Sequence, residues 1–136
     1  MEVALFEPRI PQNTGNIARS CAAFNIPLNL IEPLGFKLND KYLKRAGLDY
    51  WPLVTVNNYG NFEKFKESKQ TKRIISFSKK NGTYLKDFKF QENDVLLFGR
   101  EDSGLPDSII DKSDFLISIF MPVSYTHLTL PTIYSV

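Results

Sequence analysis

The sequence has 136 residues, in which 17 Lys and Arg stand against 15 Asp and Glu for a formal net charge of +2. This length suits one domain, and 43% hydrophobic with 24% charged residues argues against a disordered chain. The sequence has no apolar run of the roughly 20 residues that a membrane-spanning helix needs, and no signal-peptide pattern at its N-terminus. A single cysteine excludes an internal disulfide and points to a reducing compartment, so we expect a cytoplasmic protein.

The first half of the chain predicts three strands and two helices. Short apolar runs typical of buried strands occupy residues 3–6, 28–31 and 53–56. Asn13 to Asn16 offer side chains that can cap a helix, and apolar residues follow at helical spacing up to Phe24. A second helix is predicted over residues 39–45, before a glycine that suits a helix end.

The second half continues the alternation of helices and strands. A polar helix is predicted over residues 62–68, and another helix begins near Pro106, since proline suits a first helical turn. Apolar runs typical of strands occupy residues 74–77, 95–98 and 115–120. This order predicts one α/β domain with a mostly parallel sheet flanked by helices.

Basic residues are concentrated in one segment, residues 61–90. Nine of the 17 Lys and Arg lie there against three acidic residues, which gives the segment a local charge of +6. Such a block favours a polyanionic partner, because each neutralised phosphate releases condensed counterions. A solvated lysine-rich surface has the same composition, so charge alone does not identify the partner.

The first candidate for a ligand site is the segment over residues 8–20, PRIPQNTGNIARS. Gly15 permits a tight backbone path, and the amides at a helix N-terminus suit an anion. Arg19 follows Asn16 by one helical turn, so both side chains can face one ligand. The alternative is structural, with Asn13 capping the helix and Arg19 serving as an ordinary surface cation.

The second candidate is the loop over residues 98–106, FGREDSGLP, which follows a predicted strand. Gly99 and Gly104 let the backbone approach a flat ligand closely, and Glu101 adds a carboxylate in the same turn. An ordinary hydrophilic turn is the alternative. Neither candidate has the glycine pattern of dinucleotide-binding folds or of phosphate-binding P-loops, so those two classes are excluded.

Three blocks, IPQNTGNIARSCAAF, IEPLGFKLNDKYLKRAGLDYW and LLFGREDSGLP, follow one another in this order. Together they resemble the SPOUT superfamily of trefoil-knotted methyltransferases, and within it the TrmL (YibK-like) family of tRNA ribose 2′-O-methyltransferases. The resemblance covers residues 1–121 and implies an α/β fold with a knot, a homodimer, no metal, and S-adenosyl-L-methionine as the methyl donor. It implies as substrate the ribose of the wobble nucleotide, a cytidine or uridine, in leucine tRNAs.

The resemblance also assigns roles to particular residues. Asn16 and Arg19 match the first catalytic motif of the family, and Glu101 matches the acidic position of the second motif. Three positions match residues that line the S-adenosyl-L-methionine pocket, largely through backbone groups: Phe77, Gly99 and Ile119. Phe120 stands where the family usually has proline, so the backbone path beside Ile119 departs from the family pattern.

The proposed chemistry needs a way to activate a ribose hydroxyl, which is a poor nucleophile. Positioning of the two reactants supplies up to roughly 7–11 kcal/mol in such reactions. The candidates that accept or offset the hydroxyl proton are Arg19, Glu101 and a phosphate of the substrate. Because an arginine keeps its proton at neutral pH, we expect Arg19 to clamp a phosphate or ribose and to stabilise a developing alkoxide.

Two other functions fit the same blocks. One is a 2′-O-methyltransferase of the same superfamily that acts on ribosomal RNA or on another tRNA position. The other is a non-catalytic RNA-binding domain that keeps the fold. Intact Asn16, Arg19 and Glu101 favour an enzyme over the second of these.

The last fourteen residues, 123–136, differ from the rest of the chain because they contain no Lys, Arg, Asp or Glu. Their first ten, VSYTHLTLPT, resemble the translation of a transposase adapter used in sequencing libraries; a genuine terminal strand is the alternative. We therefore interpret residues 1–122 as an incomplete methyltransferase domain without its knot-closing helix, and expect the chain as it stands to be inactive and poorly soluble. The only histidine, His127, lies in this tail, so the remainder offers no histidine for a catalytic triad or metal site.

Overall fold

A computed structural model of the chain describes residues 1–38, 41, 45, 51–79 and 82–119. Apart from residues 41 and 45, the predicted helix over residues 39–45 lies outside the described residues, as does the predicted tail over residues 123–136. Lys80 and Phe120 also lie outside them.

The described residues form a seven-stranded sheet with the strand order β3-β2-β1-β6-β4-β7-β5. The strands are β1 (Glu2–Phe6), β2 (Leu28–Ile31), β3 (Val56–Tyr59), β4 (Ile74–Ser78), β5 (Thr83–Tyr84), β6 (Val95–Phe98) and β7 (Phe115–Ser118). Every described pair of neighbouring strands runs parallel, which confirms the predicted α/β class. The chain winds outward from β1 through β2 to β3 and then returns to the other side of β1. Such a switch in direction is where open α/β sheets bind ligands.

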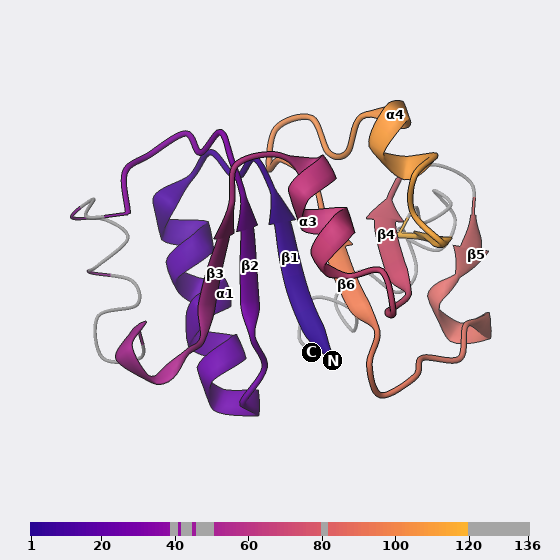
Figure 1. Cartoon of the computed structure of the whole chain (residues 1–136), viewed down its shortest axis with the longest axis horizontal. Helices are drawn as coiled ribbons and strands as arrows, with labels where there is room; N and C mark the ends of the chain where they lie inside the picture. Colours follow the sequence, from indigo (N-terminus) through magenta and orange to yellow (C-terminus); the bar gives the residue numbers. More distant parts are fainter. Residues whose placement is uncertain (39–40, 42–44, 46–50, 80–81, 120–136) are drawn as a thin grey trace, which may run out of the picture.

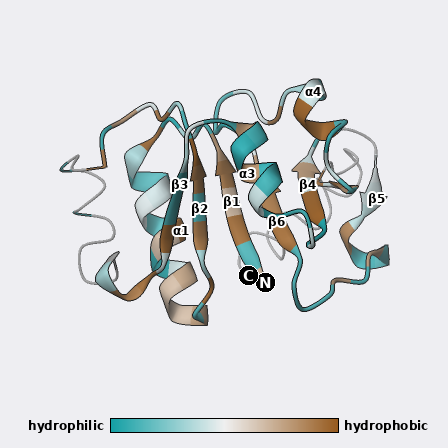
Figure 2. Ribbon diagram, viewed as in Figure 1, coloured by the Kyte–Doolittle hydropathy of each residue, from teal (hydrophilic) through white to brown (hydrophobic). Residues whose placement is uncertain are grey.

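Helices cover both faces of the sheet (Figure 1). On one face α1 (Pro11–Phe24) packs against β1 and β2 and buries Cys21. On the opposite face lie α3 (Phe62–Ser68) and α4 (Asp107–Ile110), and α3 buries Phe65 in the core there. The central strands carry mostly hydrophobic residues (Figure 2), as expected for a parallel sheet that is covered on both sides.

Successive strand residues alternate between these two faces. Phe6 belongs to the core beneath α3 and α4, whereas Leu5 belongs to the core beneath α1. The far half of the α1 face is covered differently. There, Phe88 and Phe90, which follow the short 3-10 helix η2 (Leu85–Asp87), pack against Phe77 of β4. The α1 face is thus covered by a helix on one half and by an aromatic cluster on the other.

Most of the predicted elements are confirmed. The strands predicted at residues 3–6, 28–31, 74–77 and 95–98 correspond to β1, β2, β4 and β6, and the strand predicted at 115–120 corresponds to β7. The polar helix predicted over residues 62–68 is α3. It begins where it does because the Asn61 side chain accepts a hydrogen bond from the Lys64 amide at 2.9 Å.

The third strand is confirmed, but its predicted bounds, residues 53–56, are wrong. Residues 51–53 form the 3-10 helix η1 (Trp51–Leu53), and β3 begins at Val56, which pairs with Leu28. The polar run after Val56 still forms a strand, since β3 is the edge strand of the sheet and the Asn57 side-chain amide donates to Oδ1 of Asn29 at 3.4 Å. Register with β2 has outweighed the local hydrophobic pattern.

The predicted start of the first helix is also wrong. The helix α1 begins at Pro11 rather than after Asn13, and its N-cap is Ile10, which has no polar side chain. Proline is well suited to this first position, because its missing N–H would have no partner within the helix. In α4, likewise, Pro106 is the N-cap and not the first helical residue.

Candidate active site

Strand order gathers the predicted cofactor-site residues at one end of the sheet. Phe77 lies near the end of β4, Gly99 directly follows β6 and Ile119 directly follows β7. These three strands are neighbours, although their sequence order differs from their order in the sheet. The backbones of β4 and β7 are joined at this end, because the Ile119 amide donates to the Ser78 carbonyl at 2.8 Å. We call this end of the sheet the carboxyl edge.

The side chain of Phe77 is used for packing. Its ring stacks on Phe98 at a centroid distance of 4.7 Å and on Phe90 at 6.4 Å. The side chain is therefore taken up by packing against other aromatic rings in the core. This placement is consistent with a backbone contact, in which a large residue is tolerated at this position.

The loop after β6 is a tight turn that requires glycine at two positions. A Cβ on Gly99 would lie 2.2 Å from the Gly104 carbonyl carbon, so any side chain there would displace the backbone. Gly104 itself has φ of 71°, which favours glycine. The Arg100 amide donates to the Gly104 carbonyl at 3.2 Å, and the Gly104 amide donates to the Arg100 carbonyl at 2.8 Å. The turn between them is thereby closed on itself.

Glu101, at the tip of this turn, reaches the segment that precedes α1. Its Oε2 accepts a hydrogen bond from the Arg9 amide at 2.9 Å, and its Oε1 accepts one from the Ile10 amide at 3.3 Å. Ile10 is the N-cap of α1, so a residue 91 positions away supplies the carboxylate that a local cap would otherwise provide. The two predicted motifs are in direct contact through Glu101.

A second link between the same segments involves residues that have no distinctive pattern in the sequence. Arg100 donates through Nε to Oε1 of Glu7 at 3.2 Å and forms an ion pair with the same carboxylate through Nη2. Its guanidinium also lies over the ring of Phe6, 5.4 Å from the centroid. The sequence gives only a weak indication that these two residues meet: Glu7 directly follows a predicted strand, and Arg100 directly follows Gly99 after another.

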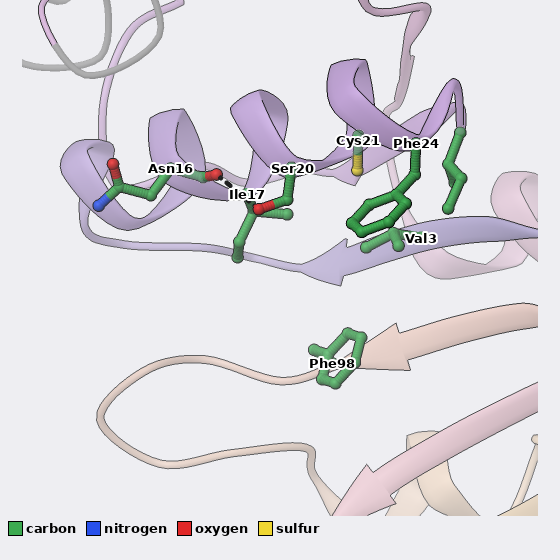
Figure 3. A pocket seen from close by; sticks show the side chains of 8 residues that line it. Val3, Asn16, Ile17, Ser20, Cys21, Phe24 and Phe98 are labelled. Carbon is green, nitrogen blue, oxygen red and sulfur yellow. Dashed lines mark hydrogen bonds between the residues drawn. The ribbon is translucent and has the colours of Figure 1, made fainter. Parts of the chain in front are cut away.

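Asn16 and Arg19 are both exposed on α1. Asn16 lies at one end of an apolar groove of about 390 Å³ between α1 and the sheet, at the end toward which β1 and β6 run (Figure 3). The other residues that line the groove are Val3, Ile17, Ser20, Cys21, Phe24, Ile26 and Phe98. Asn16 is thus near the carboxyl edge, where the predicted cofactor-site residues also lie.

Cys21 is a core residue, as its position on the apolar side of the predicted helix indicates. It is 3% exposed, and burial raises the pKa of its thiol to about 11. The thiolate needed for nucleophilic attack is therefore scarce at neutral pH. Among the described residues, no group of three or more His, Cys, Asp or Glu is placed to hold a metal ion. No helix in the described part of the chain is both long and apolar enough to cross a membrane.

The basic segment is partly neutralised within the fold. Lys69 lies 2.8 Å from Oε1 of Glu2, and Lys72 pairs with the other oxygen of the same carboxylate. Arg73 pairs with Asp94 at 2.7 Å. Glu2 and Asp94 lie outside residues 61–90, so the composition of that segment alone overstates its free charge. Among its other basic residues, those described as exposed are Lys64, Lys66, Lys79, Lys86 and Lys89.

Comparison with known proteins gives matches over most of the chain. The profile of the SpoU rRNA Methylase family matches residues 1–130. A tRNA (cytidine(34)-2′-O)-methyltransferase from Aeromonas hydrophila is 42% identical over 123 residues, which are 90% of this chain and 79% of the relative. A structure solved to study 2-OH methylation of C/U34 on tRNA superimposes with a TM-score of 0.85 at 43% identity, over 89% of this chain and 80% of that one.

The fold is also similar to that of more distant proteins. The SpoU methyltransferase AviRb from Streptomyces viridochromogenes, solved in complex with the cofactor AdoMet, superimposes with a TM-score of 0.81 at 20% identity. The match covers 91% of this chain but 49% of AviRb. At this identity the likeness is one of fold.

Proposed function

We propose that this chain, which belongs to the SpoU rRNA Methylase family, transfers a methyl group from S-adenosyl-L-methionine to the ribose 2′-hydroxyl of nucleotide 34 of a tRNA. The observation that carries the proposal is the contact between the two motif segments through Glu101, in a chain 42% identical to a tRNA (cytidine(34)-2′-O)-methyltransferase. The target nucleotide is a cytidine or uridine, and the tRNAs are leucine tRNAs. The reaction takes place in the cytoplasm.

The carboxyl edge fits S-adenosyl-L-methionine in its chemistry. The backbones of Phe77, Gly99 and Ile119 would hold it, offering amide and carbonyl groups beside apolar side chains. Backbone groups suit the neutral adenine, carbonyl oxygens suit the positively charged sulfonium, and the donor carries no phosphate that would require a P-loop. When bound, S-adenosyl-L-methionine supplies an electrophilic methyl group.

The residues of the two motifs have separate proposed roles. Arg19, exposed on α1, binds a phosphate or the ribose and stabilises negative charge that develops on the 2′-oxygen. Asn16, one helical turn earlier, orients the same ribose. Both carboxylate oxygens of Glu101 accept backbone amide hydrogens, so Glu101 contributes by fixing the start of α1. A phosphate of the substrate then becomes the preferred acceptor of the hydroxyl proton.

The test is methyl incorporation into RNA by the purified protein, followed by nucleoside mass spectrometry of defined RNA fragments. In a version in which a relative's C-terminal sequence replaces residues 123–136, we expect 2′-O-methylcytidine or 2′-O-methyluridine at position 34 of leucine tRNAs and no transfer to ribosomal RNA. The chain with its own residues 123–136 is assayed in parallel and is expected to be inactive, because that segment is predicted to be non-native.

Two outcomes of this assay overturn the proposal. Transfer to ribosomal RNA, or to another tRNA position, identifies the other enzyme of the same superfamily. RNA binding without S-adenosyl-L-methionine binding, in both versions of the protein, identifies a non-catalytic RNA-binding module. Isothermal titration with S-adenosyl-L-methionine separates this last outcome from a loss of turnover.

The functional unit is proposed to be a homodimer whose interface includes the exposed surface of α1 and the groove beside it. Phe24, near the C-terminal end of α1, is 74% exposed, and the apolar groove beside it is open to a partner. An exposed aromatic residue next to an apolar groove is typical of an interface. Sedimentation equilibrium measures the mass directly, and Phe24→Asp is expected to shift a dimer toward monomer. A wild-type protein that is monomeric at micromolar concentration contradicts this part of the proposal.

A further inference from the structure

Two consecutive residues, Arg100 and Glu101, hold the loop after β6 against the segment that leaves β1. Glu101 accepts the amides of Arg9 and Ile10, and Arg100 pairs with the carboxylate of Glu7. The partners are 91 to 93 positions apart in the chain. The relative position of the two motif segments therefore depends on contacts between distant residues.

The ion pair between Glu7 and Arg100 is sheltered from solvent. The Glu7 side chain is 16% exposed and the Arg100 side chain 24%, so solvent weakens this pair less than an ordinary surface pair. The guanidinium also contacts the Phe6 ring. Arg100 is thus held by two contacts, one from Phe6, the last residue of β1, and one from Glu7, which follows it.

Glu7 also has an unusual backbone conformation. Its φ is 47°, in the left-handed region that residues with a Cβ seldom adopt. Its amide donates to the Ile31 carbonyl at 2.9 Å, which continues the β1–β2 ladder by one residue beyond the strand. A glutamate in this conformation requires support from its surroundings, and a strained residue at the rim of a site is a reason to look for a role there.

We propose that Glu7 and Arg100 are positioning residues for the methyl transfer. Their ion pair sets where the turn over residues 99–104 lies relative to α1, and therefore where the cofactor-side backbone lies relative to Arg19. This inference rests on the proposed function. In-line displacement is sensitive to small changes in the distance between its reactants, so a loosened turn lowers turnover even when each reactant still binds.

The test compares Glu7→Gln, Arg100→Gln and the double variant with their parent protein, the version that carries a relative's C-terminal sequence in place of residues 123–136. Each single substitution is expected to lower kcat about tenfold with KM for tRNA unchanged, because binding is kept and alignment is lost. The double variant is expected to be no worse than either single variant, since both remove the same contact. Losses that multiply in the double variant, or an unchanged kcat, overturn the inference.

Two further variants separate positioning from a general effect on stability. Arg100→Lys keeps the positive charge but loses the two-nitrogen contact with Glu7, so its kcat is expected to lie between those of Arg100→Gln and the parent protein. Lys112→Gln removes the pair between Lys112 and Glu63, at 2.6 Å, which lies on the surface with side chains 44% and 65% exposed. It is the matched control and is expected to leave kcat unchanged. A loss in Lys112→Gln equal to that in Glu7→Gln also overturns the inference.

Hydrogen exchange gives a readout that does not depend on activity. In Glu7→Gln the amides of Arg9 and Ile10 are expected to exchange faster, since Glu101 then holds them less well, while the β1 amides keep their wild-type rates. Unchanged exchange at Arg9 and Ile10 overturns the inference even if kcat falls. If neither this chain nor the version with a relative's C-terminal sequence methylates RNA, the proposed function fails, and the exchange experiment still decides whether the ion pair holds the two segments together.

Discussion

Charged residues have different partners at the two ends of the parallel strands, the amino edge, where strands begin, and the carboxyl edge, where they end. At the amino edge, where β1, β4 and β6 begin, Glu2 binds Lys69 and Lys72, and Asp94 binds Arg73. Glu2 is 5% exposed and Asp94 is 1% exposed. At the carboxyl edge Glu101 is exposed, and its carboxylate accepts the backbone amides of Arg9 and Ile10.

This difference separates buried ion pairs that stabilise the core from an exposed carboxylate that positions a motif segment. Burial by itself raises the pKa of Glu2, but hydrogen bonds from Lys69, Lys72 and Asn29 outweigh it and lower the pKa from 4.5 to about 2. Hydrogen bonds from Arg73 likewise hold the pKa of Asp94 below its ordinary value. We therefore expect substitutions at the amino edge to change stability and those at the carboxyl edge to change catalysis.

The largest effect is expected at Arg19. Arg19→Ala is expected to lower methyl transfer by about 100-fold or more, because it removes a charge that stabilises the transition state. The affinity for S-adenosyl-L-methionine, measured by isothermal titration, stays near wild type if Arg19 contacts RNA. A variant that retains full turnover removes Arg19 from the mechanism.

The next effect is one of stability at the amino edge. The ionised Glu2 carboxylate makes its full contribution to the free energy of unfolding above pH 4.5. That contribution is lost as the pH falls toward 2, since the pKa of Glu2 in the folded protein is lowered to about 2. Glu2→Gln is expected to lower the free energy of unfolding at neutral pH by about 2–3 kcal/mol and to flatten its dependence on pH below 4.5. Urea unfolding at several pH values measures both. Glu63→Gln, in the exposed pair with Lys112, is the control and is expected to change little.

A smaller effect distinguishes the two possible roles of Glu101. Glu101→Gln keeps one acceptor oxygen for the amides of Arg9 and Ile10, so turnover is expected to fall less than about tenfold. Glu101→Ala removes both acceptors and is expected to be clearly worse. Equal losses in the two variants, measured as kcat, would show that Glu101 acts through its charge or as a proton acceptor.

The smallest effect is expected at Lys79, an exposed residue just beyond β4. Lys79→Glu is expected to weaken tRNA binding and to reduce the slope of log affinity against log salt by about 1, because one phosphate contact is lost. Filter binding at several salt concentrations measures this, with Lys79→Arg as the charge-preserving control. An unchanged slope would show that Lys79 contacts no RNA phosphate and is an ordinary solvated surface residue.

The sequence by itself determines the local elements whose signals lie within a few residues. Apolar runs predict β1 and β6. Asn61 marks the start of α3, because its side chain caps the helix by accepting a hydrogen bond from the amide three residues later. The two motif segments, with Asn16 and Arg19 in one and Glu101 in the other, also stand out in the sequence.

Tertiary structure alone decides how these pieces meet. The insertion of β6 between β1 and β4 brings Glu101 to the amides before α1 and Arg100 to Glu7, across more than 90 positions of chain. On the other side of β1, pairing with β2 sets the register of β3, which begins at Val56. Pairing between distant segments depends on the whole sheet closing around its core, so no local pattern encodes it. The same closure pairs Lys69 with Glu2, which is why a basic segment in the sequence becomes in part a buried ion pair in the fold.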